Sequence, residues 1–548
     1  MTTRLPKAIK DNMQFLCAEV DLQLGYLQDY FQNKATPTLA RRILDRRGYA
    51  SNLTRRIQRS SLDYITQKKS DEKAQLILRA VDMLASTLEE ITSLCRSCIE
   101  HSSYINDFST LHSKQFSAMI KLARKGVQQI LPAVELNNTQ LALSLNELEG
   151  AVSRHYKRSY KAYIAELKDG QRTEDLTRAL FIVQNLQQIG EGLKAISEAL
   201  ISANLGQSVN FERYQALQSM MGDLGESALD TLKVETIAET RSGSSITGIS
   251  NASAGDDKYL AIVKEGIKRK VKEERQGVES WHDIYPGLAP KILSYKKSGQ
   301  SAAILIEHLP GQTFESILVN EPAELLDEAL KKLGVTLRSV WRTTKSGKVV
   351  CANYMAQLAK RLPLVYQVHP EFNVGKSMVG DIGVPSFAAL LQQAQKLEQQ
   401  LNAPFSVYIH GDFNVDNIIY DSLENKINFI DLHRSQYMDY VQDVSVFMVS
   451  NYRLQILDKS VRRRIMQTAL QFYKMAKRFS QSEGDNTFEL RLALGLARSF
   501  ASSTRFILDK SLSRRMFLRA RYILELFVKA DLNKPQQFKL PLKEIFVD

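Results

Sequence analysis

Cysteine is scarce in this sequence, and long apolar runs are missing from it. Four cysteines among 548 residues are too few for a disulfide framework. No apolar run reaches the ~20 residues that a membrane-spanning helix needs, and no apolar segment of a secretory signal follows residues 1–7. We therefore expect a cytoplasmic protein without a transmembrane segment. The length predicts roughly two to four domains.

Positive charge is in excess and is unevenly distributed. Of the formal net charge of +13, roughly +11 falls in residues 451–548, roughly +3 in residues 1–230 and about −1 in residues 231–450. A basic surface attracts phosphorylated or acidic molecules, although it is also compatible with a solvated helical face. No zinc finger or aromatic-rich strand motif accompanies the arginines, which argues against nucleic-acid binding.

The most informative segment is Val407-Tyr-Ile-His-Gly-Asp-Phe-Asn-Val-Asp-Asn417, followed by Asn428-Phe-Ile-Asp431. An aspartate, an asparagine five positions later and an aspartate after a short apolar run are typical of phosphoryl transfer from a metal-bound nucleotide. Asp412 could accept the proton of a hydroxyl group, while Asn417 and Asp431 offer the oxygen ligands that Mg²⁺ prefers. Protein kinases have H-R-D in this loop and D-F-G after it. Here the loop is H-G-D, and Leu432-His433 replaces the Phe-Gly pair.

This arrangement resembles the aminoglycoside phosphotransferase and choline-kinase-like (APH) family, whose signature is H-G-D-x-x-x-x-N followed by I-D. Asp439 and Asp443 fall where that family has a G-D-P-x-x-D segment, although the glycine and proline are absent here. The resemblance implies an α+β, two-lobed, protein-kinase-like domain that uses Mg²⁺ and ATP, with GTP as an alternative. We interpret His410, Asp439 and Asp443 as structural residues that brace the loop or cap helices.

A nucleotide-binding lobe is predicted upstream of this loop. The segment 240–255 is rich in Gly, Ser and Thr, and the apolar run 259–263 that follows it ends in Lys264. In kinase-like folds a flexible hairpin of small residues covers the phosphates, and a lysine on a strand contacts them. We therefore expect four nucleotide-binding residues here, namely Ser242, Gly243, Ser244 and Lys264.

Two further elements complete that lobe. The charged helix 267–281 should supply a glutamate that pairs with Lys264; Glu274 fits the family spacing, and Glu273 and Glu279 remain alternatives. The apolar strand near 302–309 should end in the hinge that meets adenine through backbone groups. The hinge residues would be Glu307, His308 and Leu309.

Residues 1–225 predict an all-helical module. Apolar residues recur at steps of three and four, which predicts helices near 9–31, 38–68, 71–103, 114–136, 139–168 and 173–204, arranged as two antiparallel three-helix bundles. Segment 186–198 resembles a helix of the PhoU phosphate-uptake regulator family, with matches at Ile189, Gly190, Glu191, Ile196 and Glu198. Gln187 stands where that family has a metal-binding carboxylate, so whether the module binds metal stays open. An unrelated bundle is the alternative.

The sequence therefore predicts a multidomain protein, with a PhoU-like regulatory module at 1–225, a kinase-like N-lobe at 226–310 and a C-lobe with the catalytic loop at 311–548. The first functional hypothesis is an ATP-dependent phosphotransferase that acts on a hydroxyl of a small molecule, for which an anionic acceptor is one option. The second is a nucleotide-binding regulatory protein of phosphate homeostasis, with a protein partner and little turnover. A protein kinase is disfavoured by the H-G-D loop and the lack of an A-P-E element.

Overall fold

The computed structural model describes residues 5–32, 36–46, 48–67, 72–136, 138–205, 220, 232–239, 245–251, 259–298, 301–456 and 458–547. The chain divides into two units. The first consists of Met1–Asp230 and Val234–Thr236, and the second consists of Thr231–Lys233 and Ile237–Asp548. Within the described ranges, every helix is too short or too polar to cross a membrane. The predicted fold class, an all-helical N-terminal region followed by an α+β kinase-like domain, is confirmed.

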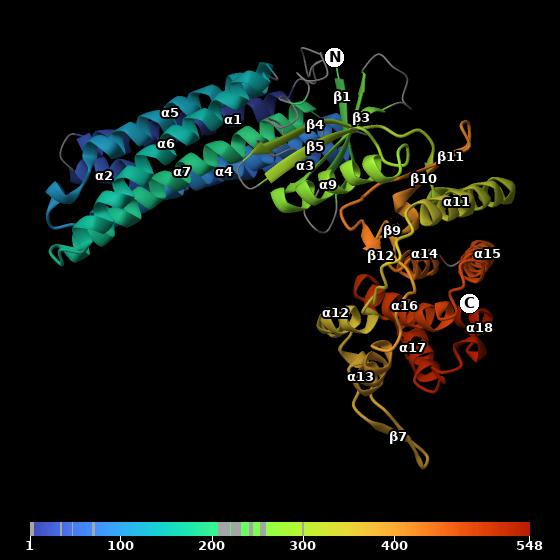
Figure 1. Ribbon diagram of the computed structural model, residues 1–548. Coiled ribbons are helices and arrows are strands. Elements are labelled where there is room, and N and C mark those ends of the chain that lie inside the picture. The colour runs from blue at the N-terminus through green and yellow to red at the C-terminus, as the bar shows by residue number, and fades with distance from the viewer. Residues whose placement is uncertain are drawn as a thin grey trace. The chain divides into compact units, whose positions relative to one another are not determined.

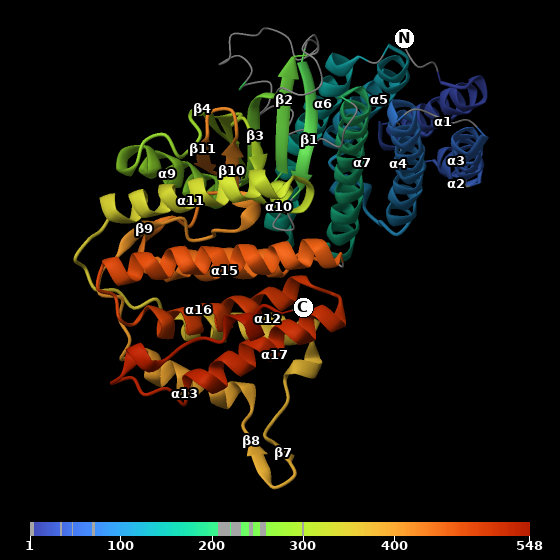
Figure 2. The same ribbon diagram turned by 90° about the vertical axis from the view of Figure 1, so that its right-hand side faces the viewer.

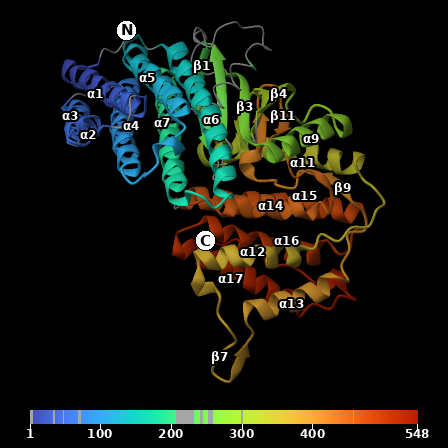
Figure 3. The same ribbon diagram turned by 90° about the vertical axis from the view of Figure 1, so that its left-hand side faces the viewer.

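Long helices form the described part of the first unit, and α5, α6 and α7 lie side by side in it (Figure 3). The helices are α1 (Lys7–Gln32), α2 (Pro37–Leu44), α3 (Tyr49–Gln67), α4 (Glu72–Ser102), α5 (Ser113–Leu136), α6 (Thr139–Leu167) and α7 (Thr173–Leu205). The predicted single helix near 38–68 is wrong, because the chain turns between α2 and α3. There Arg46 donates a hydrogen bond to Glu19 of α1 at 2.7 Å.

The expected two three-helix bundles are present, with α1, α3 and α4 in one and α5, α6 and α7 in the other, but the two bundles pack against each other. Helix α4 packs against α7 and α1 against α5, and the apolar stripes of both halves belong to one core. Helix α7 lies at the contact between the bundles: Asn185 donates to Ser97 of α4 at 3.0 Å, and within its own bundle Ser197 donates to the Ala142 carbonyl of α6 at 2.6 Å. Periodicity defines which face of a helix is apolar, but not which helix covers it.

A five-stranded sheet has the order β1-β2-β3-β5-β4, and apart from residues 234–236 of β1 it belongs to the second unit; β3, β4 and β5 are labelled in Figure 1. Its strands are β1 (Leu232–Glu239), β2 (Ser245–Asn251), β3 (Tyr259–Ile267), β4 (Ile292–Ser298) and β5 (Ser301–Glu307). Strand β3 pairs antiparallel with β2 and with β5. Helix α9 (Lys268–Ile284) covers β5, where Val271 packs against Ala302, Ile304 and Ile306. The central strands are therefore held by pairing on both edges and by apolar contacts with α9.

Helices dominate the rest of this unit, and Figure 2 shows α15, α16 and α17 as successive layers. Helix α14 has every residue buried, as expected at the centre of the large apolar core. The helices are α10 (Phe314–Asn320), α11 (Ala323–Thr343), α12 (Tyr354–Val368), α13 (Phe387–Glu398), α14 (Val441–Tyr452), α15 (Lys459–Ser482), α16 (Phe488–Ser503), α17 (Lys510–Phe527) and α18 (Leu542–Ile545).

Short strands carry the predicted catalytic loop. It runs between β9 (Val407–Ile409) and β10 (Ile418–Asp421) and includes the 3-10 turn η5 (Val415–Asn417). Strand β10 pairs with β11 (Lys426–Phe429) and with β6 (Gln312–Thr313), and β9 pairs with β12 (Gln436–Met438). The hairpin of β7 (Ser377–Val379) and β8 (Ile382–Val384) lies apart from these strands. The loop is thus anchored at both ends by strand pairing.

Gly277 permits a close approach of α9 to the segment after Asp431. A Cβ atom at position 277 would lie 2.1 Å from the carbonyl oxygen of Leu432, far inside van der Waals contact. Because that carbonyl is backbone, it cannot rotate away as a side chain would. Only glycine therefore allows the helix and the Asp431 segment to lie this close.

We expect Gly277→Ala to lower the free energy of unfolding by about 1–3 kcal/mol, as overpacking in a buried contact does. Gly347→Ala is the matched control, because a Cβ there meets no atom within 4 Å. Thermal unfolding of the full chain measures both. Equal stability of the two variants would contradict the close contact.

Candidate active site

Lys264 of β3 joins three separate elements of the second unit. Its Nζ lies 2.6 Å from Oδ1 of Asp431 and 3.2 Å from Oε1 of Glu274 on α9. Burial acts to lower the pKa of Lys264, but the two carboxylates outweigh it and the net pKa is raised. The lysine therefore stays charged in a largely buried place, as a phosphate-binding cation must.

The glutamate that pairs with Lys264 is Glu274. It is 4% exposed, whereas its two sequence alternatives pair with surface arginines of the same helix. Glu273 lies 3.5 Å from Arg269, and Glu279 lies 2.8 Å from Arg275. Helix phase decides the choice, since position 274 faces the sheet together with Val271.

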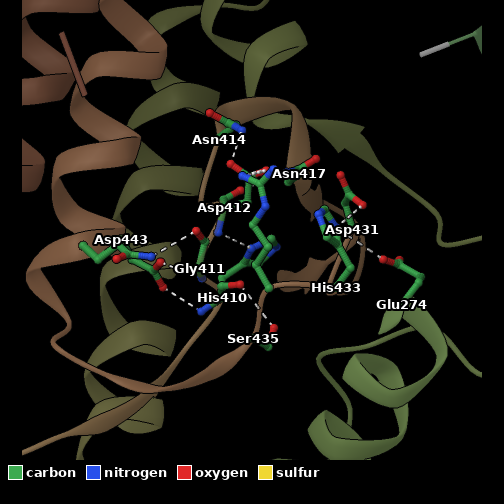
Figure 4. Close-up of polar contacts among 12 residues, drawn as sticks. Glu274, His410, Gly411, Asp412, Asn414, Asn417, Asp431, His433, Ser435 and Asp443 are labelled. Carbon is green, nitrogen blue, oxygen red and sulfur yellow. Dashed lines mark hydrogen bonds and ion pairs between the residues drawn. The ribbon is translucent and has the colours of Figure 1, made fainter. Parts of the chain in front are cut away.

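The H-G-D loop is held by buried hydrogen bonds (Figure 4). Asp443 of α14 accepts from the backbone N–H groups of His410 and Gly411, at 2.8 and 2.9 Å. The Nε2 atom of His410 lies 2.9 Å from the Ile430 carbonyl oxygen, which ties the loop to the residue before Asp431. Gly411 has a φ of 82°, and a Cβ there would lie 2.3 Å from the Arg434 carbonyl oxygen. A residue with a side chain would not fit this turn.

Asp412 and Asn417 both lie in this loop. Asp412 lines the cavity described below, whereas Asn417 is buried in the turn η5. The Oδ1 atom of Asp412 accepts from Asn414 at 3.0 Å, and its Oδ2 lies 2.9 Å from Nη1 of Arg434. Asn417 donates from Nδ2 to the Asp412 carbonyl oxygen at 2.9 Å. That bond fixes the amide so that its Oδ1 is the atom left for a ligand. The Ile430 N–H donates to the Asn417 carbonyl at 3.0 Å, which joins this turn to the Asp431 segment.

The donor set at Asp431 fits a hard divalent cation such as Mg²⁺. Asp431 has a φ of 62°, a left-handed conformation that turns its carboxylate toward Glu274 and His433, and ligand atoms of these three residues lie within 4.8 Å of one another. The Oε2 atom of Glu274 is buried without a hydrogen-bond partner. Burial acts to raise the pKa of Asp431, but His433 and Lys264 hold it well below its usual range. Carboxylate oxygens are ligands that Mg²⁺ prefers; Asn417, the other predicted Mg²⁺ ligand, is not among the residues that line the cavity.

The remaining predicted nucleotide-binding residues are in two segments, Ser242–Ser244 and Glu307–Leu309. Ser242, Gly243 and Ser244 fall between β1 and β2 and outside the described residues; β2 occupies part of the Gly/Ser-rich segment. Glu307 ends β5, where its Oε1 accepts from the Lys291 N–H at 2.8 Å. His308 and Leu309 follow in the segment after β5, and His308 contacts Tyr259 edge-on, with ring centroids 5.6 Å apart.

Asp439 does not line the cavity. It is fully buried and forms an ion pair with Arg491 of α16, and it accepts from the Tyr354 hydroxyl at 3.2 Å. Its Oδ1 also accepts from the Val441 N–H at 3.1 Å, at the start of α14. These contacts give it a structural position, behind the loop rather than in it.

Several of the predicted site residues line one cavity of about 1260 Å³. Lys264, Glu274 and Asp431 line it with Asp412, Gly411 and Asn414. Three groups in the cavity were not predicted as site residues from the sequence: His433, Arg434, and a set of cations from α12, from the residue after α14, and from α16 with the 3-10 turn η6 (Thr504–Phe506) that follows it. His433 was detectable as the ionisable residue two positions after Asp431. The cations come from elements far apart in sequence, so no local pattern marks them.

The comparisons identify the kind of domain. Residues 280–474, within the second unit, match the model of the phosphotransferase enzyme family, APH. The match includes the H-G-D loop and Asp431 and begins after Lys264 and Glu274. No curated protein matches the sequence.

Solved structures resemble each part of the chain at low sequence identity. PhoU from Pseudomonas aeruginosa is 15% identical, with 36% of this chain and 96% of that one covered and a TM-score of 0.33. Plasmodium vivax ethanolamine kinase is 14% identical, with 62% and 92% covered and a TM-score of 0.35. An aminoglycoside-3'-phosphotransferase of type VIII is 14% identical, with 49% and 100% covered and a TM-score of 0.31. Likenesses this distant assign no acceptor.

Asp443, which accepts hydrogen bonds from the backbone of His410 and Gly411, should make the stability of the fold depend on pH. Burial raises the pKa of Asp443 to about 7, although the two backbone N–H groups act against the shift. Because the folded-state pKa lies above that of an unfolded aspartate, the group stabilises the fold most at low pH and loses this contribution as the pH rises from about 4 to 7.

We therefore compare the free energy of unfolding of the wild type with that of Asp443→Asn. The difference, wild type minus variant, should fall as the pH rises from about 4 to 7 and should stay constant above pH 7. Thermal or denaturant unfolding at several pH values measures the difference. A difference that grows in favour of the wild type with rising pH would contradict the raised pKa.

Proposed function

We propose that the second unit transfers the γ-phosphoryl group of ATP, or of GTP, to a hydroxyl group of a small molecule. The observation that carries this proposal is the convergence of Lys264, Glu274, Asp431 and Asp412 in one cavity. An APH-family match over the loop and Asp431 supports the same class of reaction. The hinge residues and the Ser242–Ser244 segment are proposed to contact the nucleotide, as their sequence positions predict.

In the proposed reaction, Asp412 accepts the proton of the acceptor hydroxyl as its oxygen attacks the γ-phosphorus. The bond from that phosphorus to the oxygen shared with the β-phosphate breaks, and ADP leaves. Lys264 neutralises the phosphates that are not transferred, and Glu274 holds its ammonium in place. Asn417 and Asp431 would hold Mg²⁺, which supplies positive charge against the phosphate oxygens. Arg434 and Asn414 orient the Asp412 carboxylate.

The helical unit is proposed to connect this activity to phosphate regulation through a protein partner. That proposal depends on the resemblance of segment 186–198 to the PhoU family. Gln187 is buried, and its Nε2 donates to Oε1 of Glu191 at 3.4 Å. Because residue 187 is a glutamine, this position offers no carboxylate for a metal. A cytoplasmic location, where ATP and Mg²⁺ are available, is part of the same proposal.

Asp412→Asn tests the base. Removing the proton acceptor should lower acceptor-dependent turnover by roughly 10²–10⁴-fold while nucleotide binding stays intact. Asp421→Asn is the matched control, because Asp421 is a buried aspartate at the end of β10 that accepts turn N–H groups and lies outside the cavity. Turnover is measured with ATP, Mg²⁺ and a panel of hydroxyl compounds. Undiminished turnover in Asp412→Asn would sink this assignment.

Asp431→Asn tests the metal-binding role. Mg²⁺ should tighten ATP binding to the wild type, and the variant should lose that gain, by roughly tenfold or more. Isothermal titration with and without Mg²⁺ measures it, again beside Asp421→Asn. A regulatory protein that only binds nucleotide would show the same Mg²⁺-dependent ATP binding but no turnover with any hydroxyl compound. An Mg²⁺ response that survives in Asp431→Asn would contradict the role of Asp431.

A further inference from the structure

The part of the cavity around Asp412 carries an excess of positive charge. Its cationic side chains come from α12, from the segments that follow β11 and α14, and from α16 with its 3-10 turn η6 (Thr504–Phe506): Lys360, Arg361, Arg434, Arg453, Arg498 and Arg505. The carboxylates there are Asp412 and Asp416. Asp412 already pairs with Arg434, and Asp416 interacts with Arg453. Arg361, Arg498 and Arg505 make no ion pair among the described residues.

Arg498 is the strongest indication of a missing ligand. It is 5% exposed, and its Nε and Nη2 atoms are buried without a hydrogen-bond partner. Its guanidinium lies 5.6 Å from the Tyr354 ring, but the Tyr354 hydroxyl already donates to Asp439. A buried guanidinium with unpaired N–H groups is costly unless a partner arrives. The neighbouring Ser499 hydroxyl is also buried without a partner and lines the same cavity.

The arginines interact electrostatically with one another, and Asp412 lies within the same range of them. Burial, together with Arg498, Arg505 and Arg434, lowers the pKa of Arg361 to about 10. Burial also lowers the pKa of Arg498 and Arg505, and Asp412 acts in the opposite direction on both. The group is therefore gathered near Asp412, where the acceptor hydroxyl must lie. Guanidinium groups bind phosphate and carboxylate oxygens through paired N–H donors.

We propose that the acceptor itself is an anion: a small hydroxyl compound with a phosphate or carboxylate group, which Arg361, Arg498 and Arg505 bind while its hydroxyl faces Asp412. This rests on the proposed phosphotransferase function and specifies its substrate class. The same surplus of positive charge would repel a cationic acceptor.

The binding test uses the full chain with Mg²⁺ and saturating ADP, so that the nucleotide phosphates do not compete. Glycerol, glycerate and glycerol 3-phosphate are titrated as a matched neutral, carboxylate and phosphate set. We expect binding of one or both anions, weakened at least roughly tenfold in Arg361→Gln and Arg505→Gln, with ADP affinity unchanged. Arg463→Gln, an exposed arginine of α15 outside the cavity, should bind as the wild type does. The carboxylate and phosphate arms distinguish the two sources of the anion.

The turnover test separates this inference from the proposed function. In the wild type, the anionic compounds should be phosphorylated in preference to glycerol and to the cation choline, and the arginine variants should raise the KM for the acceptor but not for ATP. Turnover that favours glycerol or choline, absence of anion binding, or variants that lose only ATP affinity would overturn the anionic acceptor. Anion binding that the variants abolish, with no phosphoryl transfer to any compound, would leave the anion site standing and refute the phosphotransferase.

Discussion

The ion cluster of Lys264, Glu274 and Asp431 is the contact on which the site depends. It joins β3, α9 and the segment after β11, which are far apart in the sequence. Loss of one partner from a buried ion pair costs about 3–5 kcal/mol, because the other charge stays buried and unpaired. The cluster therefore fixes the distance between Lys264, which we propose binds the phosphates, and Asp431, which we propose binds the metal. Gly277 lets α9 approach closely enough for this contact.

A second set of contacts fixes the base relative to that cluster. Asp443 holds the backbone of His410 and Gly411, and the His410 ring reaches the Ile430 carbonyl next to Asp431. The ion cluster and these hydrogen bonds both consist of buried polar groups that have a partner. Together they restrict the loop to one arrangement. Preorganisation of this kind is what phosphoryl transfer requires, since its catalysis comes from alignment and charge.

Local patterns predicted the parts of the site that are close in sequence. The spacing of Asp412, Asn417 and Asp431 was sufficient to predict a phosphotransferase loop, and the resemblance in spacing favoured Glu274 over Glu273 and Glu279. Contacts between distant elements could not be predicted: Arg361 and Arg498 lie on different helices, and the excess charge of residues 451–548 gave an indication of Arg498 but none of Arg361. In the first unit, periodicity located the helices and the two bundles, but it could not reveal that α4 with α7 and α1 with α5 join those bundles, because any apolar stripe can cover any other.

The most direct test of the central claim follows the phosphoryl group itself. The full chain is incubated with Mg²⁺, ATP labelled with ¹⁸O in its γ-phosphoryl group, and a mixture of hydroxyl compounds, and the products are analysed by mass spectrometry. The account predicts ADP and a phosphate ester in which the labelled group is attached to the hydroxyl oxygen of one acceptor. Labelled inorganic phosphate alone, or intact ATP with every acceptor, would contradict it.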